Sequence, residues 1–360
     1  MTTIQKHKSV LAAAIIGAAL ALGATITSES QAGGELSALT WEGYTDPSFV
    51  SIFEERTGCK FRPTYVGSND EIMTKMAAGG GVYDLVSPAV NYSQMMIEMD
   101  VFEPLDPARL ENFDDIFESF RTHPGVRDAD GTIWAMPMAW GAIPLMYRTD
   151  KFDEPPTSAT VLWDPKYKGK IATQDVSMTI FMAARIVFGP DTDVYNLSDE
   201  QLEIVKLKLI EQKPLLRTYW AQAGDLIDLY VKGEVWVSET WGGYQVAVLQ
   251  EQGIPVAEAI PIEKADGWQD VWNVVKGTPN LDCAYDWINF ISSTDGQCGM
   301  VHVAGYSPAN PVAVQDCLTA EEKAFHHLED SGYVKGLDFW QVQPRIEKYV
   351  EVWNAVKAAP

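Results

Sequence analysis

The chain has 360 residues, of which 46% are hydrophobic and 21% charged, and its mean hydropathy is −0.10. These values are typical of an ordinary folded protein and exclude a disordered or low-complexity chain. The formal net charge of −23 argues against nucleic acid and anionic membrane surfaces as partners. It is compatible with the attraction of cations, although many exported proteins are acidic for solubility alone.

The first 32 residues have the pattern of a secretory signal peptide. Lys6 and Lys8 precede an apolar run over residues 10–24, and Ser30-Gln31-Ala32 fits a signal-peptidase site. The apolar run is too short and too rich in Ala and Gly to span a membrane, which takes about 20 residues. We therefore expect an exported protein, with no direct membrane insertion, whose mature chain begins near Gly33.

The remaining chain is long enough for two lobes, because about 328 residues exceed what one hydrophobic core usually organises. It contains four cysteines, Cys59, Cys283, Cys298 and Cys317, which allow three complete disulfide pairings in an oxidising compartment. We favour one bridge within the group formed by the last three. The spacing of the cysteines shows no metal-binding pattern.

Short strands and helices alternate after the signal. We expect strands at 36–41, 59–66 and 83–87, and helices that begin at Pro47, at Ser68-Asn69 and at Tyr92. This order predicts parallel pairing through right-handed crossovers, and hence an open α/β sheet. Ligands of such sheets lie at the carboxyl ends of the strands, here 41–44, 87–91 and, later, Asp175.

Residues 132–147 are apolar and interrupted by prolines, which suggests a strand that leaves one lobe for the other. A second α/β pattern follows this crossover. Its expected strands are 170–174, 235–238, 256–262 and 268–275, and its expected helices are 178–188, 198–212, 282–292, 294–303 and 342–357.

The segment Gly267-Trp268-Gln269-Asp270-Val271-Trp272 places one carboxylate between two indoles. Alternate residues of a strand share a face, so Trp268, Asp270 and Trp272 are predicted to lie together. A carboxylate beside aromatic faces suits an organic cation, since each cation–ring contact contributes about 0.5–2 kcal/mol. The competing interpretation is a core strand with one capped aspartate.

Seven short motifs occur along the mature chain in a recognisable order. They are Trp41-Glu42-Gly43-Tyr44, Tyr83-Asp84-Leu85-Val86, Leu162-Trp163-Asp164-Pro165-Lys166-Tyr167-Lys168-Gly169, Trp241-Gly242, Trp268-Gln269-Asp270, Gly305-Tyr306-Ser307-Pro308 and Trp340-Gln341. In this order and spacing the chain resembles the periplasmic spermidine/putrescine-binding proteins of ABC importers. The resemblance covers almost the whole mature chain.

The resemblance implies a two-lobed periplasmic-binding-protein fold of the type II kind, with an open α/β sheet in each lobe and a hinge between them. The first lobe would comprise 33–140 plus 270–313, and the second 141–269 plus 314–360. A ligand cleft would separate the lobes. The protein would be a periplasmic monomer that delivers a small cation to the transmembrane permease of an ABC importer.

Matching positions one at a time, the resemblance implies a site of aromatic walls and carboxylates. The implied ligand-binding residues are Trp41, Tyr44, Asp175, Trp241, Trp268, Asp270, Tyr306 and Gln341. Asp270 and Asp175 would pair with ligand nitrogens. Glu42, Glu239 and Trp272 are further candidates near these motifs.

Three positions depart from the pattern of the resembled family. Met178 stands where that family has a second acid, and Ala89 and Asn91 stand where it has a serine and a tyrosine. A charged hydrogen bond is worth about 1.5–3 kcal/mol, so these losses are large enough to move preference away from a triamine. Met178 and Asn91 stay candidate contacts of a shorter or singly cationic ligand.

Two other functions stay open. The same fold would serve a quaternary ammonium, amino acid or opine-like ligand. A cleft of aromatic rings and carboxylates also describes exported glycosidases. The sequence shows no Gly-x-Ser-x-Gly and no His-Glu-x-x-His motif, so we expect no enzyme activity, no cofactor and no metal.

Overall fold

The computed structural model describes residues 34–79, 81–328, 333 and 337–360. The expected signal peptide and the expected start near Gly33 lie outside these residues. Within them, no helix is long and apolar enough to cross a membrane.

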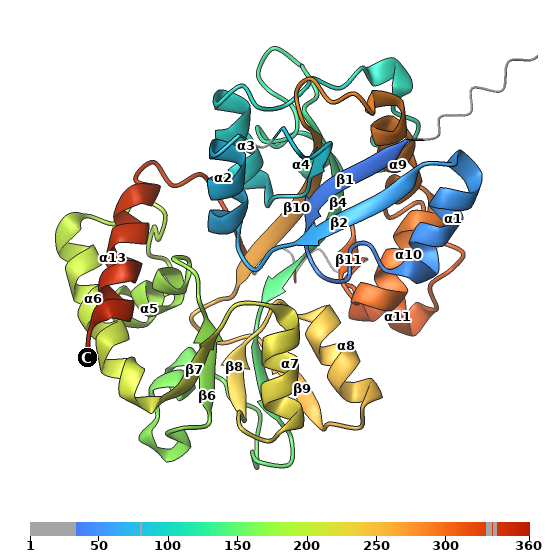
Figure 1. Cartoon of the computed structure of the whole chain (residues 1–360). Coiled ribbons are helices and arrows are strands. Elements are labelled where there is room, and N and C mark those ends of the chain that lie inside the picture. The colour runs from blue at the N-terminus through green and yellow to red at the C-terminus, as the bar shows by residue number, and fades with distance from the viewer. Residues whose placement is uncertain (1–33, 80, 329–332, 334–336) are drawn as a thin grey trace, which may run out of the picture. The chain divides into compact units, whose positions relative to one another are not determined.

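The larger sheet has seven strands (Figure 1). Its hydrogen-bonded order is β11 (Ser307–Pro308), β4 (Ala135–Ile143), β10 (Asp266–Val274), β3 (Leu85–Val86), β1 (Glu35–Thr40) and β2 (Lys60–Tyr65), and β12 (Asp338–Phe339) also pairs with β10. β1 is parallel to β2 and β3, as the strand–helix–strand order predicted. β10 is antiparallel to both β3 and β4, so the sheet is mixed.

The smaller sheet has five strands. Its order is β7 (Leu216–Trp220), β6 (Ile171–Gln174), β8 (Val237–Glu239), β5 (Leu145–Arg148) and β9 (Val256–Ala259). β6 is parallel to β7 and β8, whereas β5 is antiparallel to β8 and β9. The expected strand at 256–262 ends early, and β7 was not expected from the sequence.

The α-helices of the described residues are α1 (Pro47–Thr57), α2 (Asn69–Ala77), α3 (Val90–Glu98), α4 (Glu118–Arg121), α5 (Thr179–Phe188), α6 (Asp199–Gln212), α7 (Ala223–Val231), α8 (Gly243–Glu251), α9 (Leu281–Ser292), α10 (Thr294–Ala304), α11 (Ala320–Phe325) and α13 (Ile346–Ala358). Ser198 begins α6 with a capping box that includes Gln201, as its position predicted. The sequence did not predict α7 or α8. Both begin without a Ser, Thr, Asp or Asn cap, at Gln222 and Gly242.

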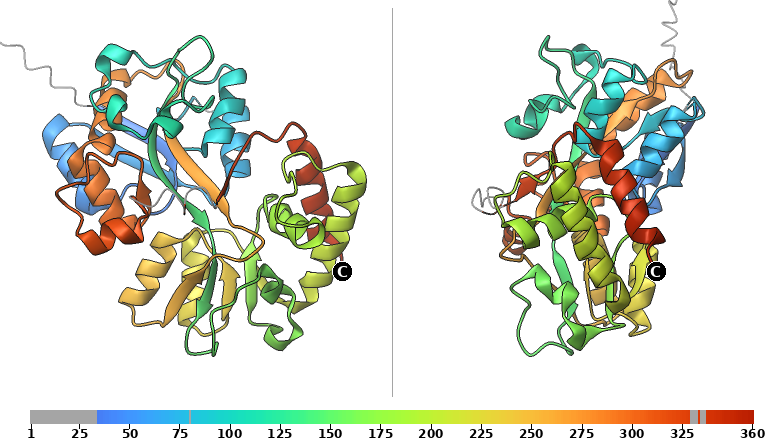
Figure 2. Two further views of the ribbon diagram at one scale, coloured as in Figure 1. Left: turned by 180° about the vertical axis from the view of Figure 1, so that it is seen from behind. Right: turned by 90° about the vertical axis from the view of Figure 1, so that its left-hand side faces the viewer.

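The chain passes from one sheet to the other between β4 and β5 (Figure 2). Only Pro144 separates the two strands, which confirms that residues 132–147 leave one sheet for the other. β10 pairs with β4 from Asp266, opposite Ile143, to Asn273, opposite Ala135. The residues at which the lobes divide stay a prediction, since this pairing continues past 140 and begins before 270.

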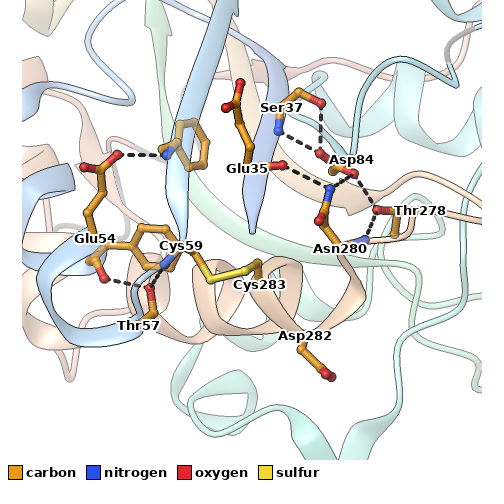
Figure 3. Close-up of a disulfide and its surroundings, with 12 residues drawn as sticks. Glu35, Ser37, Glu54, Thr57, Cys59, Asp84, Thr278, Asn280, Asp282 and Cys283 are labelled. Carbon is orange, nitrogen blue, oxygen red and sulfur yellow. Dashed lines mark hydrogen bonds between the residues drawn. A yellow bond between two sulfur atoms is a disulfide. The ribbon is translucent and has the colours of Figure 1, made fainter. Parts of the chain in front are cut away.

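The described residues form two disulfides, one local and one between distant parts of the chain. Cys298–Cys317 confirms the bridge expected within the last three cysteines, and Cys59–Cys283 connects the start of β2 to α9 across 224 residues (Figure 3). Near the Cys59–Cys283 bridge, Asp84 accepts hydrogen bonds from Ser37, Thr278 and Asn280. Burial opposes ionisation of Asp84, but these hydrogen bonds outweigh it and lower its pKa.

A buried ion triad fixes the beginning of β10. Nη2 of Arg185 on α5 lies 2.6 Å from Oδ1 of Asp266 and 2.8 Å from Oδ2 of Asp338 on β12. The same region holds Trp340, whose backbone N–H donates to the carbonyl of Gly267 at 2.8 Å. The triad thereby places β12 and Trp340 beside the strand that carries Asp270.

Candidate ligand-binding site

A pocket lies between segments that belong to the two sheets. Its lining comes from the ends of β1, β4, β6 and β8, from the interior of β10 and from the beginning of α2. The lining residues are Trp41, Tyr44, Ser68, Asn69, Ile143, Gln174, Val176, Met178, Trp241, Trp268, Asp270, Tyr306 and Trp340. This composition is mostly aromatic and apolar, with a small number of polar groups, as is usual for sites that bind small molecules.

Asp270 supplies the carboxylate of the pocket. It pairs with Ala139 in β4 and bridges to Ala89, so the backbone on both sides holds it in place. Its side chain is buried, with 6% exposure, and its Oδ2 accepts a 2.7 Å hydrogen bond from the Tyr44 hydroxyl. Burial raises the pKa of Asp270 to about 7, and the hydrogen bond from Tyr44 only partly opposes that rise.

Five aromatic side chains surround this carboxylate. Trp41 and Trp241, from different sheets, meet edge to face with ring centroids 5.6 Å apart. The ring of Tyr306 meets Tyr44 at 5.6 Å and Trp268 at 4.9 Å, again nearly perpendicular. Ring faces that do not stack on each other remain available to a cation or an alkyl chain.

The position of the Trp268 ring depends on the glycine opposite it in β4. Trp268 lies opposite Gly141 in β4, and a Cβ at Gly141 would come within 2.6 Å of the indole ring. The ring therefore occupies the space that a larger residue would fill. Its Nε1 donates to the carbonyl of Ala142 at 3.1 Å, which fixes the ring's orientation.

The rest of the lining is neutral. Ser68 and Asn69 begin α2, and Gln174, Met178 and Trp340 contribute an amide, a thioether and an indole. Among the described lining residues, Asp270 is the one carboxylate, and there is no lysine, arginine or histidine. A ligand charge of +1 is therefore matched by a side chain, and a ligand carboxylate is not.

Hydrogen bonds between the two sheets close the rim of the pocket. Oγ of Ser177 donates to Oδ2 of Asp70 at 3.1 Å, and the Gln174 amide donates to the carbonyl of Gly67 at 3.3 Å. Glu42, which follows β1, accepts from the backbone N–H of Gly224 in α7 at 3.1 Å.

The pocket brings together six of the eight residues implied as ligand contacts. They are Trp41, Tyr44, Trp241, Trp268, Asp270 and Tyr306, and the further candidate Met178 joins them. Their contact with a ligand stays a prediction. The remaining candidates lie elsewhere.

Asp175 is not part of the pocket lining, contrary to expectation. Its Oδ1 accepts from Nε1 of Trp353 at 2.9 Å and lies 2.8 Å from Nζ of Lys357. Both partners belong to the C-terminal helix α13. The carboxylate therefore pairs with a cation of the protein itself.

Gln341 and Asn91 also lie outside the pocket. Gln341 borders a separate hollow beside Asp191, and its backbone carbonyl accepts from Nδ2 of Asn91 at 3.3 Å. Asn91 is buried under this contact, with 1% exposure. The residue before Gln341, Trp340, reaches the pocket in its place.

The last three candidates have other neighbours. Glu42 caps α7 as described above, and Glu239 is buried and accepts a 2.5 Å hydrogen bond from Thr173. The ring of Trp272 packs edge to face against Phe61 and Trp287, so it belongs to the core. The register of β10 against β4 shifts between Asp270 and Val271, which interrupts the alternation of faces, so the expected grouping of Trp272 with Trp268 and Asp270 is not found in the pocket.

The sequence analysis missed Ser68, Asn69, Ile143, Gln174, Val176 and Trp340 as lining residues. Features of the sequence near some of these residues could have indicated them. Ser68 and Asn69 stand at a predicted helix start, and Gln174 ends a predicted strand one residue before Asp175. Trp340 belongs to the Trp340-Gln341 motif, of which only Gln341 was expected to contact a ligand.

Among the described residues, no group of three or more His, Cys, Asp and Glu side chains is placed to hold a metal ion. Residues 48–327 match the family described as bacterial extracellular solute-binding protein. The chain belongs to this family. Solute-binding proteins of ABC importers bind small ligands and deliver them to permeases, and neither this family nor this fold is a class of enzymes. The glycosidase interpretation thereby loses its support.

Relatives of this solute-binding protein cover nearly its whole length. It is 24% identical to the putrescine-binding periplasmic protein PotF of Escherichia coli K12, with 98% of each chain aligned. It is 25% identical to a gamma-aminobutyric acid-binding protein of Pseudomonas aeruginosa, over 93% of this chain and 94% of that one.

The fold is that of two-lobed periplasmic binding proteins. A solved structure described as a putative spermidine/putrescine ABC transporter from Listeria monocytogenes superposes with a TM-score of 0.78 at 22% identity. The superposition covers 91% of this chain and 99% of the other. The expected fold class is therefore confirmed.

Proposed function

We propose that this solute-binding protein captures a small organic cation of the amine class and delivers it to the permease of an ABC importer. The observation that carries the proposal is the buried Asp270 carboxylate inside a wall of aromatic rings. The putrescine-binding relative supports the same class of ligand.

The charge of the pocket favours a cation. Asp270 has no cationic partner among the described residues that line the pocket, and its burial keeps water from solvating the ionised form. An ammonium group would supply the missing counter-charge. The alkyl part of the ligand would then lie against Trp41, Trp241 and Trp268.

The interactions that the pocket offers are sufficient for micromolar affinity. Micromolar affinity requires about 8 kcal/mol. A charged hydrogen bond contributes about 1.5–3 kcal/mol, each ring contact about 0.5–2 kcal/mol, and each buried methylene about 0.8 kcal/mol. Three or four rings and a four-carbon chain reach the required range after the entropy of ordering the ligand is subtracted.

A zwitterionic ligand such as 4-aminobutyrate fits the lining less well. Its ammonium would meet Asp270, but its carboxylate would find no lysine, arginine or histidine among the described lining residues. The ligand carboxylate could be bound only by neutral donors, such as those at the beginning of α2. The gamma-aminobutyric acid-binding relative makes this ligand a necessary part of the test.

We further propose that the protein acts in the periplasm as a monomer, after removal of residues 1–32. The secretory pattern of those residues and the periplasmic relatives support this location.

Calorimetric titration of the purified mature chain tests the proposal. The panel is putrescine, spermidine, choline, glycine betaine and 4-aminobutyrate. We expect micromolar or tighter binding of an amine that carries no carboxylate. Tighter binding of glycine betaine or 4-aminobutyrate than of every simple amine would contradict the proposal.

A further inference from the structure

A second cavity adjoins the ligand pocket and shares two wall residues with it. Trp241 and Tyr306 line both spaces. The second cavity is otherwise bordered by the crossover strands around Gly141 and Ala142, by the turn at Gly242 and Gly243, and by Glu258 of β9.

Glu258 is a partly buried carboxylate, and one of its two oxygens has no hydrogen-bond partner. Its Oε1 is shielded from solvent and accepts no hydrogen bond, and no ion pair joins it to another described residue. A buried charge of this kind is costly unless a counter-ion or a proton neutralises it. Burial raises the pKa of Glu258 to about 7. Binding of a cation near neutral pH would therefore favour the ionised carboxylate.

The described residues around the second cavity include no lysine or arginine. Burial lowers the pKa of His326 to about 4, so this imidazole is neutral at neutral pH. His327 stacks flat on Tyr333, with ring centroids 3.4 Å apart.

The backbone leaves the approach to Glu258 open. Gly242 begins α8 with a φ of +78°, and a Cβ there would lie 3.4 Å from Oε1 of Glu258. Glycine therefore keeps side-chain atoms away from the carboxylate. Tyr306 lines both spaces, and its pKa is raised well above the ordinary value by burial first and then by neighbouring groups that include Asp270, Tyr244, Glu42 and Glu258.

We propose that the second cavity is a subsite for a protonated amine, with the Glu258 carboxylate as its counter-ion. It rests on the proposed function, because it assigns the same class of ligand to both cavities. The ammonium group comes either from the far end of a diamine held at Asp270 or from a second amine molecule. In both cases Glu258 supplies the second carboxylate that Asp175, paired with Lys357, does not supply.

The test compares 1-aminobutane with α,ω-diaminoalkanes of three to eight carbons, titrated calorimetrically into the mature chain. The variants are Glu258→Gln, Asp270→Asn and, as a matched control, Glu251→Gln at an exposed position of α8. If a single diamine spans both cavities, Glu258→Gln weakens the best diamine at least tenfold. It leaves 1-aminobutane unchanged, and the stoichiometry stays at one.

If the second cavity takes a separate molecule, the wild-type protein binds two equivalents of 1-aminobutane. Glu258→Gln then abolishes one of them, and Asp270→Asn abolishes the other. Either result supports the subsite. The control Glu251→Gln should match the wild type throughout.

Equal affinities and stoichiometry in wild type and Glu258→Gln would overturn the subsite while leaving the function proposed for Asp270 intact. Failure of every amine to bind the wild type would overturn both. Thermal unfolding verifies that each variant is folded. If Glu258→Gln does not fold, Glu258→Asp keeps the charge and withdraws it by one methylene, and a smaller loss confined to the second ammonium is expected.

Discussion

The hydroxyl of Tyr44 donates a 2.7 Å hydrogen bond to Oδ2 of Asp270, across 226 residues of sequence. Tyr44 is 1% exposed, and its pKa is raised well above the ordinary value by burial and by the neighbouring Asp270. Tyr44 is therefore a neutral donor at every physiological pH. It orients the carboxylate, and no other hydrogen bond to the Asp270 side chain occurs among the described residues.

Replacing Tyr44 by phenylalanine should weaken binding of the amine about three- to tenfold, because the ring stays and one hydrogen bond to the carboxylate is lost. The pKa of Asp270 should also rise further, since Tyr44 now lowers it. Calorimetric titration at several pH values measures both effects. An unchanged affinity would mean that the ligand does not depend on the orientation of Asp270.

Asp270 should make binding depend on pH. Its pKa in the folded protein, about 7, lies above its ordinary value of 3.8. In the empty protein this group therefore stabilises the fold most at low pH, and that contribution is lost as pH rises through about 7. A cation binds the ionised form, so affinity should fall up to tenfold for each pH unit below 7 and level off above it.

Asp270→Asn is the variant that tests this assignment. It should weaken amine binding at least tenfold at pH 8 and, in a background that also carries Glu258→Gln, remove the pH dependence between 5 and 7. Asp175→Asn should keep the full pH dependence, because Asp175 does not line the pocket. A pH profile that survives in Asp270→Asn would assign the titration to another group.

Trp268 and Trp272 stand two residues apart and should respond differently to alanine. Trp268 lines the pocket, whereas Trp272 packs against Phe61 and Trp287. Trp268→Ala should reduce affinity about tenfold with a small change in stability. Trp272→Ala should lower the free energy of unfolding by about 3–5 kcal/mol. Chemical denaturation and titration of both variants make the comparison, and a reversed pattern would exchange their roles.

Asp175→Asn should leave amine affinity within about twofold of the wild type. It removes the ion pair with Lys357, so the main effect should be a loss of about 1 kcal/mol in stability, because both groups are only partly buried. Lys357→Met is the matched variant and should behave alike. A tenfold loss of diamine affinity in Asp175→Asn alone would return this carboxylate to the binding site.

The disulfide between Cys59 and Cys283 closes a loop of more than two hundred residues. Replacing both cysteines by serine should lower the free energy of unfolding by about 4–5 kcal/mol, mainly through the greater entropy of the unfolded chain. Amine affinity should not change, because neither cysteine lines the pocket. Loss of binding in a variant that remains folded would instead show that the bridge shapes the site.

The sequence alone predicted the local elements and several of the residues that line the pocket. Hydrophobic periodicity located the strand that became β6, the capping serine at 198 located α6, and the apolar run at 132–147 revealed the passage between sheets. These features depend on neighbours in the chain. The helices α7 and α8 were missed because they begin without the usual capping residues.

The family motifs correctly gathered Trp41, Tyr44, Trp268 and Asp270 into one pocket. They did not decide which way a polar side chain turns at the end of a strand. Asp175 and Gln174 are adjacent at the end of β6, yet Gln174 lines the pocket and Asp175 pairs with Lys357, because α13 brings a lysine to that side.

What the sequence by itself determined is the order of most strands and helices, and the presence of one carboxylate among indoles on β10. Only the tertiary structure decided which acids meet a protein cation and which stay without one. Asp175 pairs with Lys357, whereas the buried Asp270 and the partly buried Glu258 have no lysine or arginine among the described residues that line their cavities. The physical reason is that a charge is neutralised by whatever lies within a few ångströms, and those neighbours come from distant parts of the chain.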